Sequence, residues 1–123
     1  MKRKKKIKIL MLAAEITPIA KVGGLGDVLG SLPPALASQG CEVRVMLPLY
    51  GLVDPRRYGL KKIMARIKVS PAGASVNVWA GKLPGTPVKL YWLEADKYFG
   101  DRRIYSPSFS EHADSERFIF FTN

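Results

Sequence analysis

An apolar run, a glycine-rich turn, an amphipathic stretch and a second apolar run follow one another in the first 50 residues of this chain. The first run, IKILMLAA (7–14), is almost continuously apolar, which is typical of a strand buried on both faces of a parallel sheet. The second, CEVRVMLPLY (41–50), carries apolar residues at every second position and predicts another strand, which Pro48 ends. A strand, a helix and a strand in this order form a βαβ unit. The sequence therefore predicts an α/β fold with a parallel, Rossmann-like sheet.

The stretch between these two strands predicts a helix over DVLGSLPPALASQG (27–40). Pro33 and Pro34 are expected to kink or restart this helix, because proline lacks an N–H donor and its ring clashes with the preceding turn. Gly40 is expected to end it, since glycine is common just past a helix C-terminus. The apolar residues that recur at helical spacing are Val28, Leu29, Leu32, Ala35 and Leu36.

The second half of the chain predicts three further strands, in LKKIMARIKV (60–69), SVNVWAGKL (75–83) and VKLYWLEA (88–95). The turn clusters SPAGA and PGTP separate them, so we expect a β-hairpin or meander inserted into the parallel sheet. Residues 96–113 are aromatic and polar and predict a loop. The last segment, DSERFIFFTN, begins with a capping-type residue, Asp114.

The net charge of +10 comes largely from the start of the chain. A basic tail over residues 1–6, together with Lys8, holds six of the twenty basic residues, and the remainder carries 14 basic and 10 acidic residues. Such a tail can bind RNA or an anionic membrane. No aromatic residues interleave with these charges, as a stacking platform for bases would need. We therefore expect a solvated tail with no nucleic-acid or membrane partner, and a basic module that binds RNA or another polyanion is the alternative.

Cysteine and histidine usage limits the chemistry of the chain. The single cysteine, Cys41, excludes an internal disulfide framework, and with the single histidine, His112, it excludes a metal site built from these residues. One cysteine also fits a reducing compartment, so the expected location is the cytoplasm. The uninterrupted apolar run from Ile9 to Ala14 is too short for a signal-peptide core or a membrane span. We expect neither a metal nor a cofactor.

The loop between the first strand and the helix holds Gly23, Gly24 and Gly26 close behind Lys21. In parallel α/β sheets, ligands bind at the carboxyl ends of the strands, where a helix N-terminus attracts anions. Glycine lets the backbone approach a phosphate without a Cβ in the way, and the lysine adds a positive charge. The loop predicts a diphosphate site, although it matches neither the G-x-G-x-x-G fingerprint nor the P-loop. A glycine-rich turn beside a solvated lysine is the alternative.

The segment EITPIAKVGGLGDVLGSLPPALASQGCEVRVMLPLYG (15–51) closely resembles the N-terminal signature of bacterial glycogen synthases and plant starch synthases. The family pattern K-[TV]-G-G-L-x-D-V is present as KVGGLGDV (21–28), and the resemblance resumes in VKLYWLEADKYFGDRRIYS (88–106) and DSERFIFFT (114–122). These enzymes are retaining ADP-glucose glycosyltransferases with two Rossmann-like domains, the GT-B architecture. The resemblance implies that residues 1–123 form an incomplete N-terminal glycosyltransferase domain, whose partner is a missing C-terminal Rossmann-like domain.

Position by position, the resemblance implies a binding site for ADP-glucose. Lys21 is similar to the family lysine that contacts the donor diphosphate, and Gly23 and Gly24 match the backbone that closes over it. Asp27 occupies the acidic position near the sugar or the acceptor, and Asp114 resembles the acidic residue that borders the glucose site. No catalytic residue is assigned within this chain.

Both aspartates also have purely structural interpretations. Asp27 could offset the helix dipole, which is worth about 0.3–1 kcal/mol. Asp114 could cap the last helix, which contributes about 1 kcal/mol. Two departures from the family pattern stand nearby, because Ser115 replaces the usual asparagine and Val22 replaces the commoner threonine.

The implied reaction moves glucose from ADP-glucose to the non-reducing end of an α-1,4-glucan, with retention at the anomeric carbon. Positive groups held against the departing ADP would lower the barrier, because their interaction grows as charge develops. We expect no useful glucosyltransferase activity from this chain alone, because the family builds much of the donor site from later segments. A related glycosyltransferase that uses another nucleotide sugar is a further alternative.

Overall fold

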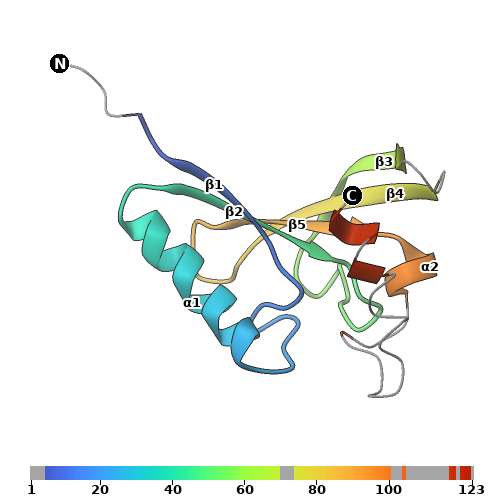
Figure 1. Ribbon diagram of the computed structural model, residues 1–123, viewed down its shortest axis with the longest axis horizontal. Helices are drawn as coiled ribbons and strands as arrows, with labels where there is room; N and C mark the ends of the chain where they lie inside the picture. The colour runs from blue at the N-terminus through green and yellow to red at the C-terminus, as the bar shows by residue number, and fades with distance from the viewer. Residues whose placement is uncertain (1–4, 70–73, 101–103, 105–116, 119, 123) are drawn as a thin grey trace.

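A mixed five-stranded sheet forms the centre of the computed structural model, which describes residues 5–69, 74–100, 104, 117, 118 and 120–122. The strands lie in the order β1-β2-β5-β4-β3 (Figure 1). The elements are β1 (Lys8–Leu12), α1 (Gly24–Ser38), β2 (Glu42–Pro48), β3 (Lys61–Val69), β4 (Ala74–Lys82), β5 (Lys89–Glu94) and the short helix α2 (Asp96–Phe99).

The sheet confirms the predicted α/β fold with a meander inserted into a parallel sheet. β1 pairs with β2 in parallel, and α1 connects them and packs against β2. β3, β4 and β5 follow as an antiparallel meander, in which β5 also pairs in parallel with β2. β5 therefore joins the βαβ unit to the meander. The short helix α2 lies inside the segment that the sequence predicted to be a loop.

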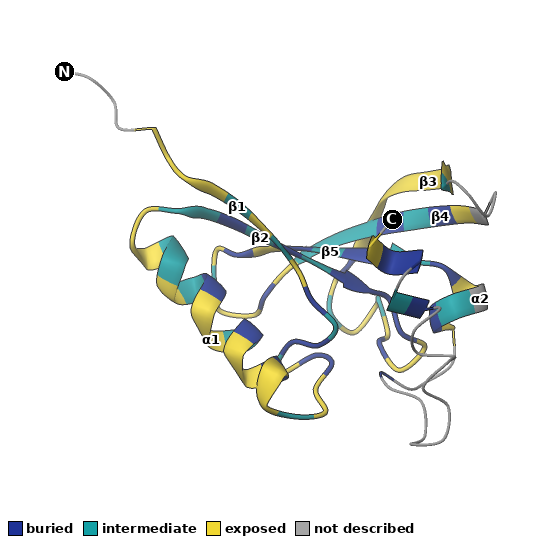
Figure 2. Ribbon diagram, viewed as in Figure 1, coloured by how far each residue is buried: buried dark blue, intermediate teal, exposed yellow. Residues whose placement is uncertain are grey.

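The first strand is shorter and more exposed than the sequence predicted. β1 covers residues 8–12 instead of 7–14, and its residues alternate between exposed and half-buried. Leu10 and Leu12 are exposed, whereas Ile9 is half-buried. Figure 2 shows β1 largely in the colour of exposed residues. The prediction of burial on both faces was wrong because β1 is an edge strand and only the face toward α1 is covered.

The helix α1 runs through both prolines as one element, so the predicted restart of the helix was wrong. Its buried residues are Gly26, Leu29 and Pro33, a stripe in which one proline itself faces the core. Of the predicted core residues, Val28, Leu32 and Ala35 are exposed and Leu36 is half-buried. Proline is tolerated here because its ring supplies apolar surface to the stripe, which offsets the lost backbone hydrogen bonds.

The end of α1 confirms the predicted stop at Gly40. This residue has a φ of +92°, the left-handed conformation that glycine adopts without strain. Its N–H donates to the carbonyl of Ala37 at 3.0 Å, and the N–H of Cys41 donates to the carbonyl of Leu36 at 3.1 Å. These two bonds form a Schellman motif, which turns the chain directly into β2.

The core extends from the sheet to the carboxyl ends of β2 and β5. Trp92, Leu90, Val45 and Leu47 are fully buried in the central strands. Beyond the strands, the chain after β2 and α2 meet, where Tyr50 and Phe99 pack edge to face with ring centres 5.8 Å apart. No helix of the described residues is long and apolar enough to cross a membrane.

Arg117 ties the last described helical residues to this end of the sheet. Its guanidinium is buried, and it donates to the carbonyls of Tyr98 at 2.7 Å and Ile104 at 3.1 Å. The rings of Tyr50 and Phe99 lie 5.8 Å and 5.3 Å from it. These contacts keep the carboxyl ends of β2 and β5 packed, and thereby support the neighbouring loop that precedes α1.

Candidate functional site

The loop after β1 is held to the start of α1 by a buried carboxylate, that of Glu15. This residue is the third after the end of β1, and only 1% of its surface is exposed. Its Oε1 accepts hydrogen bonds from the N–H groups of Gly23 at 3.1 Å and Gly26 at 2.6 Å. The carboxylate thus satisfies donors that a helix N-terminus otherwise leaves unpaired, and its charge matches the positive end of the helix dipole.

The outer side of the same loop carries a small polar cluster of Thr17, Lys21 and Asp27. The ammonium of Lys21 lies 2.9 Å from Oδ1 of Asp27, and both side chains are about half exposed. The hydroxyl of Thr17 donates to the same oxygen at 2.9 Å. The N–H of Thr17 also donates to the carbonyl of Gly26 at 3.0 Å. Asp27 therefore holds Lys21 at the mouth of the loop.

The glycines of this region fall into two pairs with different surroundings. A Cβ on Gly23 or Gly24 would meet no heavy atom within 4 Å. A Cβ on Gly26 would lie 3.1 Å from Oε1 of Glu15, and one on Gly30 would lie 3.0 Å from the carbonyl oxygen of Thr17. The first pair leaves open backbone toward solvent, and the second pair allows the loop to lie closely against α1.

The structure brings four of the predicted site residues together, namely Lys21, Gly23, Gly24 and Asp27. The fifth, Asp114, lies outside the described residues. One part of the sequence argument needs correction, because Glu15 already occupies two of the N–H groups at the start of α1. Among the described residues, no acceptor binds the N–H groups of Gly24 and Leu25, which remain as donors for a ligand.

A shallow hollow of about 340 Å³ adjoins this cluster. It extends from Asp27 along the side of α1 toward the turn between β4 and β5. The residues that line it are Thr17, Pro18, Asp27, Gly30, Ser31, Leu83, Pro84 and Thr86. Within the described part of the chain, no group of three or more His, Cys, Asp and Glu side chains could hold a metal ion.

Residues 8–123 match the family described as the starch synthase catalytic domain. The chain belongs to this family. Glycogen synthase 1 of Geobacter sulfurreducens is 43% identical over 122 residues, and the match covers 95% of this chain. Glycogen synthase of Anaeromyxobacter sp. (strain K) is 41% identical over 118 residues, or 94% of this chain. The chain spans 24% of the length of each relative.

The fold of a solved synthase agrees with this membership. The catalytic domain of starch synthase IV from Arabidopsis thaliana, bound to ADP and acarbose, is similar with a TM-score of 0.77 and 27% sequence identity. The likeness covers 96% of this chain and 24% of that one. The α/β architecture described above is therefore that of the N-terminal part of a starch synthase catalytic domain.

The structural role of Glu15 was not predicted from the sequence, although its position gives one indication of it. Glu15 directly follows the apolar run of residues 9–14 and stands eight residues before the first glycine of the turn. A carboxylate so close to a buried strand is costly to bury unless hydrogen-bond donors face it, and the backbone N–H groups of the glycine turn are such donors. The pairing with Gly23 and Gly26 depends on the path of the loop. That path brings residues eight and eleven positions apart into contact, and the sequence pattern does not show it.

Replacing Lys21 by methionine is expected to raise the pKa of Asp27 toward its ordinary value. The hydrogen bond from Lys21, followed by that from Thr17, lowers the pKa of Asp27 in the folded chain. A lowered pKa means that Asp27 contributes stability fully above the unfolded-state value of about 3.9, and loses it as the pH falls through the folded value. An NMR titration of the Asp27 carboxyl carbon measures the change. The Lys68→Met variant is the control, and equal titration curves for all three proteins would refute the contact.

Proposed function

We propose that this chain supplies part of the donor-diphosphate site of a glycogen or starch synthase, which transfers glucose from ADP-glucose to an α-1,4-glucan with retention. The observation that carries the proposal is the exposed ammonium of Lys21 beside the open backbone of Gly23 and Gly24. The residues stand where the chain leaves β1 and enters α1, at the carboxyl end of a parallel pair. Membership of the starch synthase family supports the same function.

Each residue has a distinct part in the proposed site. Lys21 would bind the diphosphate of the donor and stabilise the negative charge that develops on the departing ADP. The free N–H groups of Gly24 and Leu25 would donate to the same phosphates, because no Cβ at Gly23 or Gly24 blocks the approach. Asp27 would orient Lys21 and contact the sugar or acceptor, and Asp114 would border the glucose.

The ion pair of Lys21 with Asp27 has a consequence for binding. A diphosphate that reaches Lys21 must either share the Lys21 ammonium with Asp27 or displace Asp27 from it. Sharing is possible because the ammonium has three donor hydrogens. We infer that Asp27 keeps the lysine extended at the mouth of the loop before the donor arrives. Pre-orientation of a flexible side chain reduces the entropy lost on binding.

The wider proposal covers the whole protein. The solved starch synthase IV is described as bound to ADP and acarbose, which supports nucleotide and glucan ligands for this chain's complete domain as well. We propose a C-terminal Rossmann-like domain as its partner across the donor site, and the cytoplasm as its location. We expect the isolated 123-residue chain to show no turnover of ADP-glucose.

A calorimetric titration with ADP tests the site. We expect Lys21→Ala to weaken ADP binding about tenfold, the loss that follows from one hydrogen bond to a charged group. Lys68→Ala, at an exposed lysine of β3, is the matched control and should bind as the wild type does. Equal ADP affinity in wild type and Lys21→Ala would remove Lys21 from the site, and no binding by the folded wild type would contradict the proposal that this segment holds the diphosphate.

A further inference from the structure

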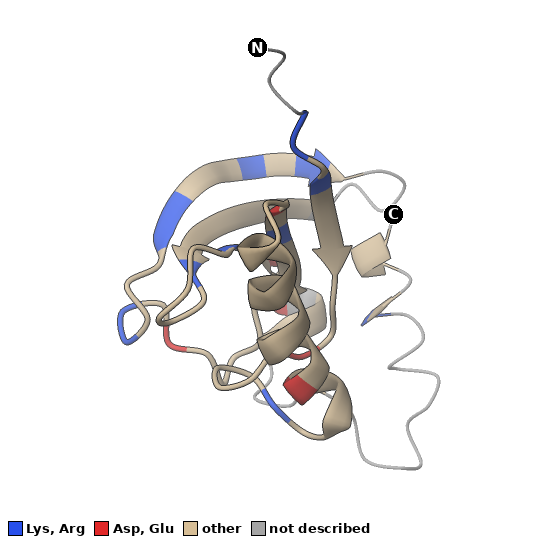
Figure 3. Ribbon diagram, turned by 90° about the vertical axis from the view of Figure 1, so that its left-hand side faces the viewer, with Lys and Arg blue, Asp and Glu red and all other residues tan. Residues whose placement is uncertain are grey.

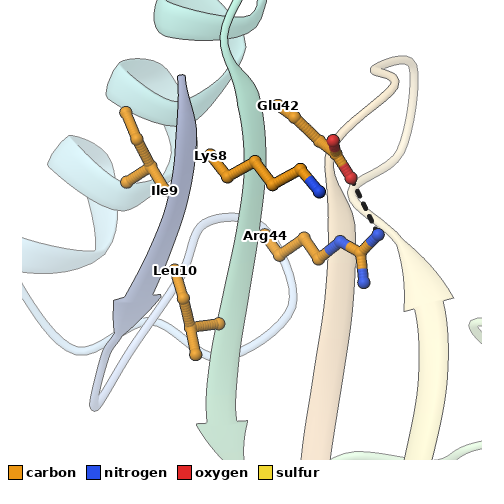
Figure 4. Close-up of a pocket in the computed structure, with 5 residues that line it drawn as sticks. All are labelled: Lys8, Ile9, Leu10, Glu42 and Arg44. Atoms are coloured by element: carbon orange, nitrogen blue, oxygen red, sulfur yellow. Dashed lines mark hydrogen bonds and ion pairs between the residues drawn. The ribbon is translucent and has the colours of Figure 1, made fainter. Parts of the chain in front are cut away.

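The face of the sheet that α1 leaves uncovered carries a row of positive charges. Arg44 of β2, Lys89 of β5 and Lys82 of β4 are direct neighbours in the strand register. Figure 4 shows Arg44 on this face together with Lys8 and Glu42, whereas Ile9 lies toward α1. Because neighbouring strands are about 4.8 Å apart, three cationic side chains rise side by side.

Without a bound anion, this row of positive charges lowers the free energy of unfolding of the chain. Like charges directly opposite each other in a sheet repel, and Lys82 and Lys89 form such a pair. The usual benefit of charged strands, protection of an exposed edge, does not apply, because β2, β5 and β4 are all interior strands. Lysine and arginine gather on the strands and are absent from α1 (Figure 3).

Among the described residues, one carboxylate, that of Glu42, forms an ion pair with this row of positive charges, and it does so only with Arg44. Glu42 accepts a hydrogen bond from Arg44 at 2.8 Å. This bond is the main cause of the lowered pKa of Glu42, and the charges of Lys8 and Lys89 act in the same direction. Lys82 and Lys89 form no ion pair with any described carboxylate.

A third lysine and two tyrosines complete a concave surface beside this row. Lys61, Lys82 and Lys89 line a hollow of about 680 Å³, together with Tyr58 and Tyr91. All three lysines are exposed, and they come from three different strands. The hydroxyl of Tyr91 accepts a hydrogen bond from Nη1 of Arg44 at 2.8 Å, which leaves its own proton available to a ligand.

We propose that this hollow binds a small anion that carries two or more phosphate groups. Three ammonium groups from separate strands match a multivalent anion better than a single carboxylate, and such a ligand would relieve the repulsion between Lys82 and Lys89. The volume holds an oligophosphate or a phosphorylated sugar, with the tyrosines at its wall. These ligands have in common a cluster of negatively charged phosphate oxygens, which the lysines would bind.

The hollow and the glycine loop share no lysine, although Pro84 of the turn between β4 and β5 lines both this hollow and the smaller one beside Asp27. Lys89 begins β5 and Lys82 ends β4, whereas Lys21 follows the carboxyl end of β1. β5 and β1 both run parallel to β2, so the hollow lies at the opposite end of the sheet from the proposed donor site. The inference therefore stands whether or not Lys21 binds a nucleotide sugar.

Calorimetric titration and thermal unfolding with sodium tripolyphosphate at constant ionic strength test the proposal. We expect tripolyphosphate to bind more tightly than orthophosphate and to raise the Tm of the wild type. Lys82→Gln and Lys89→Gln should each weaken binding about tenfold, as expected for one lost hydrogen bond to a charged group. The Lys68→Gln control should bind as the wild type does. All variants and their reference protein are made in the Lys21→Ala background, so that tripolyphosphate held at the glycine loop does not enter the comparison.

A charge reversal gives a second, opposite readout. Lys89→Glu should raise the Tm without ligand, because an opposite-charge pair with Lys82 replaces a repulsive one, and should abolish tripolyphosphate binding. Equal losses in Lys89→Gln and Lys68→Gln, or no tripolyphosphate binding by Lys21→Ala with the lysines of the hollow intact, would overturn the assignment. So would tighter binding of oligouridylate, per phosphate, that disappears when residues 1–6 are deleted, since the partner would then be nucleic acid held by the tail.

Discussion

Glu15→Ala is expected to destabilise the chain by about 2–3 kcal/mol, because two backbone donors lose a charged acceptor in a buried position. The N–H of Gly23 is the more costly of the two to leave unpaired, because that of Gly26 also donates to the carbonyl of Gly23 at 3.1 Å. The unfolding transition in urea measures the loss. Glu15→Gln keeps an acceptor of similar shape and should lose roughly half as much, because a neutral hydrogen bond is about half as strong.

A matched control separates this effect from the general loss of a carboxylate. Glu42 is half-buried at the start of β2 and pairs with Arg44, which is itself partly exposed. Exposed ion pairs contribute little, so Glu42→Ala should cost much less than Glu15→Ala. Equal destabilisation by the two variants would show that Glu15 does not hold the loop to α1.

The second large effect is expected from alanine at Gly26, compared with alanine at Gly24. Both residues lie in the first turn of α1, where glycine costs about 1 kcal/mol of helix stability relative to alanine. At Gly26 the new Cβ would lie 3.1–3.3 Å from Glu15, Lys21 and Thr17, so the loop must shift. We expect a net loss of about 2 kcal/mol, as for other overpacked sites.

Gly24→Ala should have the opposite pattern of effects. Its Cβ would project into open space, so the chain should unfold at the same urea concentration as the wild type or a higher one. ADP binding should weaken in this variant, because a methyl group would stand where the proposed diphosphate approaches the backbone. Urea unfolding and ADP calorimetry on the two variants measure these changes. Unchanged ADP affinity in stable Gly24→Ala would contradict the proposed approach, and a stable Gly26→Ala would contradict the close contact.

Much of the fold follows from local patterns in the sequence. The alternation around Val45 predicts β2, the glycine at position 40 predicts the end of α1, and the turn clusters predict the meander. These features depend on residues a few positions apart, whose conformational preferences do not depend on where the segment lies in the tertiary structure. The glycine loop was predicted for the same reason, and with it the grouping of Lys21 and Asp27.

Other features depend on contacts between distant segments, and there the sequence argument was wrong or incomplete. Leu10 and Leu12 have the hydrophobicity of core residues, yet β1 lies at an edge and leaves them exposed. Val28 lies at a suitable helical spacing but is exposed, because Pro33 and Leu29 define the buried stripe. Apolar character shows that a side chain can be buried, but only the neighbouring elements decide whether it is.

The sequence by itself determined the order of the five strands and of α1, the family to which the chain belongs and the residues of the glycine loop. The tertiary structure decided that β5 pairs with β2, that Glu15 binds the start of α1, and that Lys82 faces Lys89. Each of these three features is either a pairing between neighbouring strands or a contact that closes a loop. Its energy depends on a distance between atoms far apart along the chain, and no local pattern of residue types contains that distance.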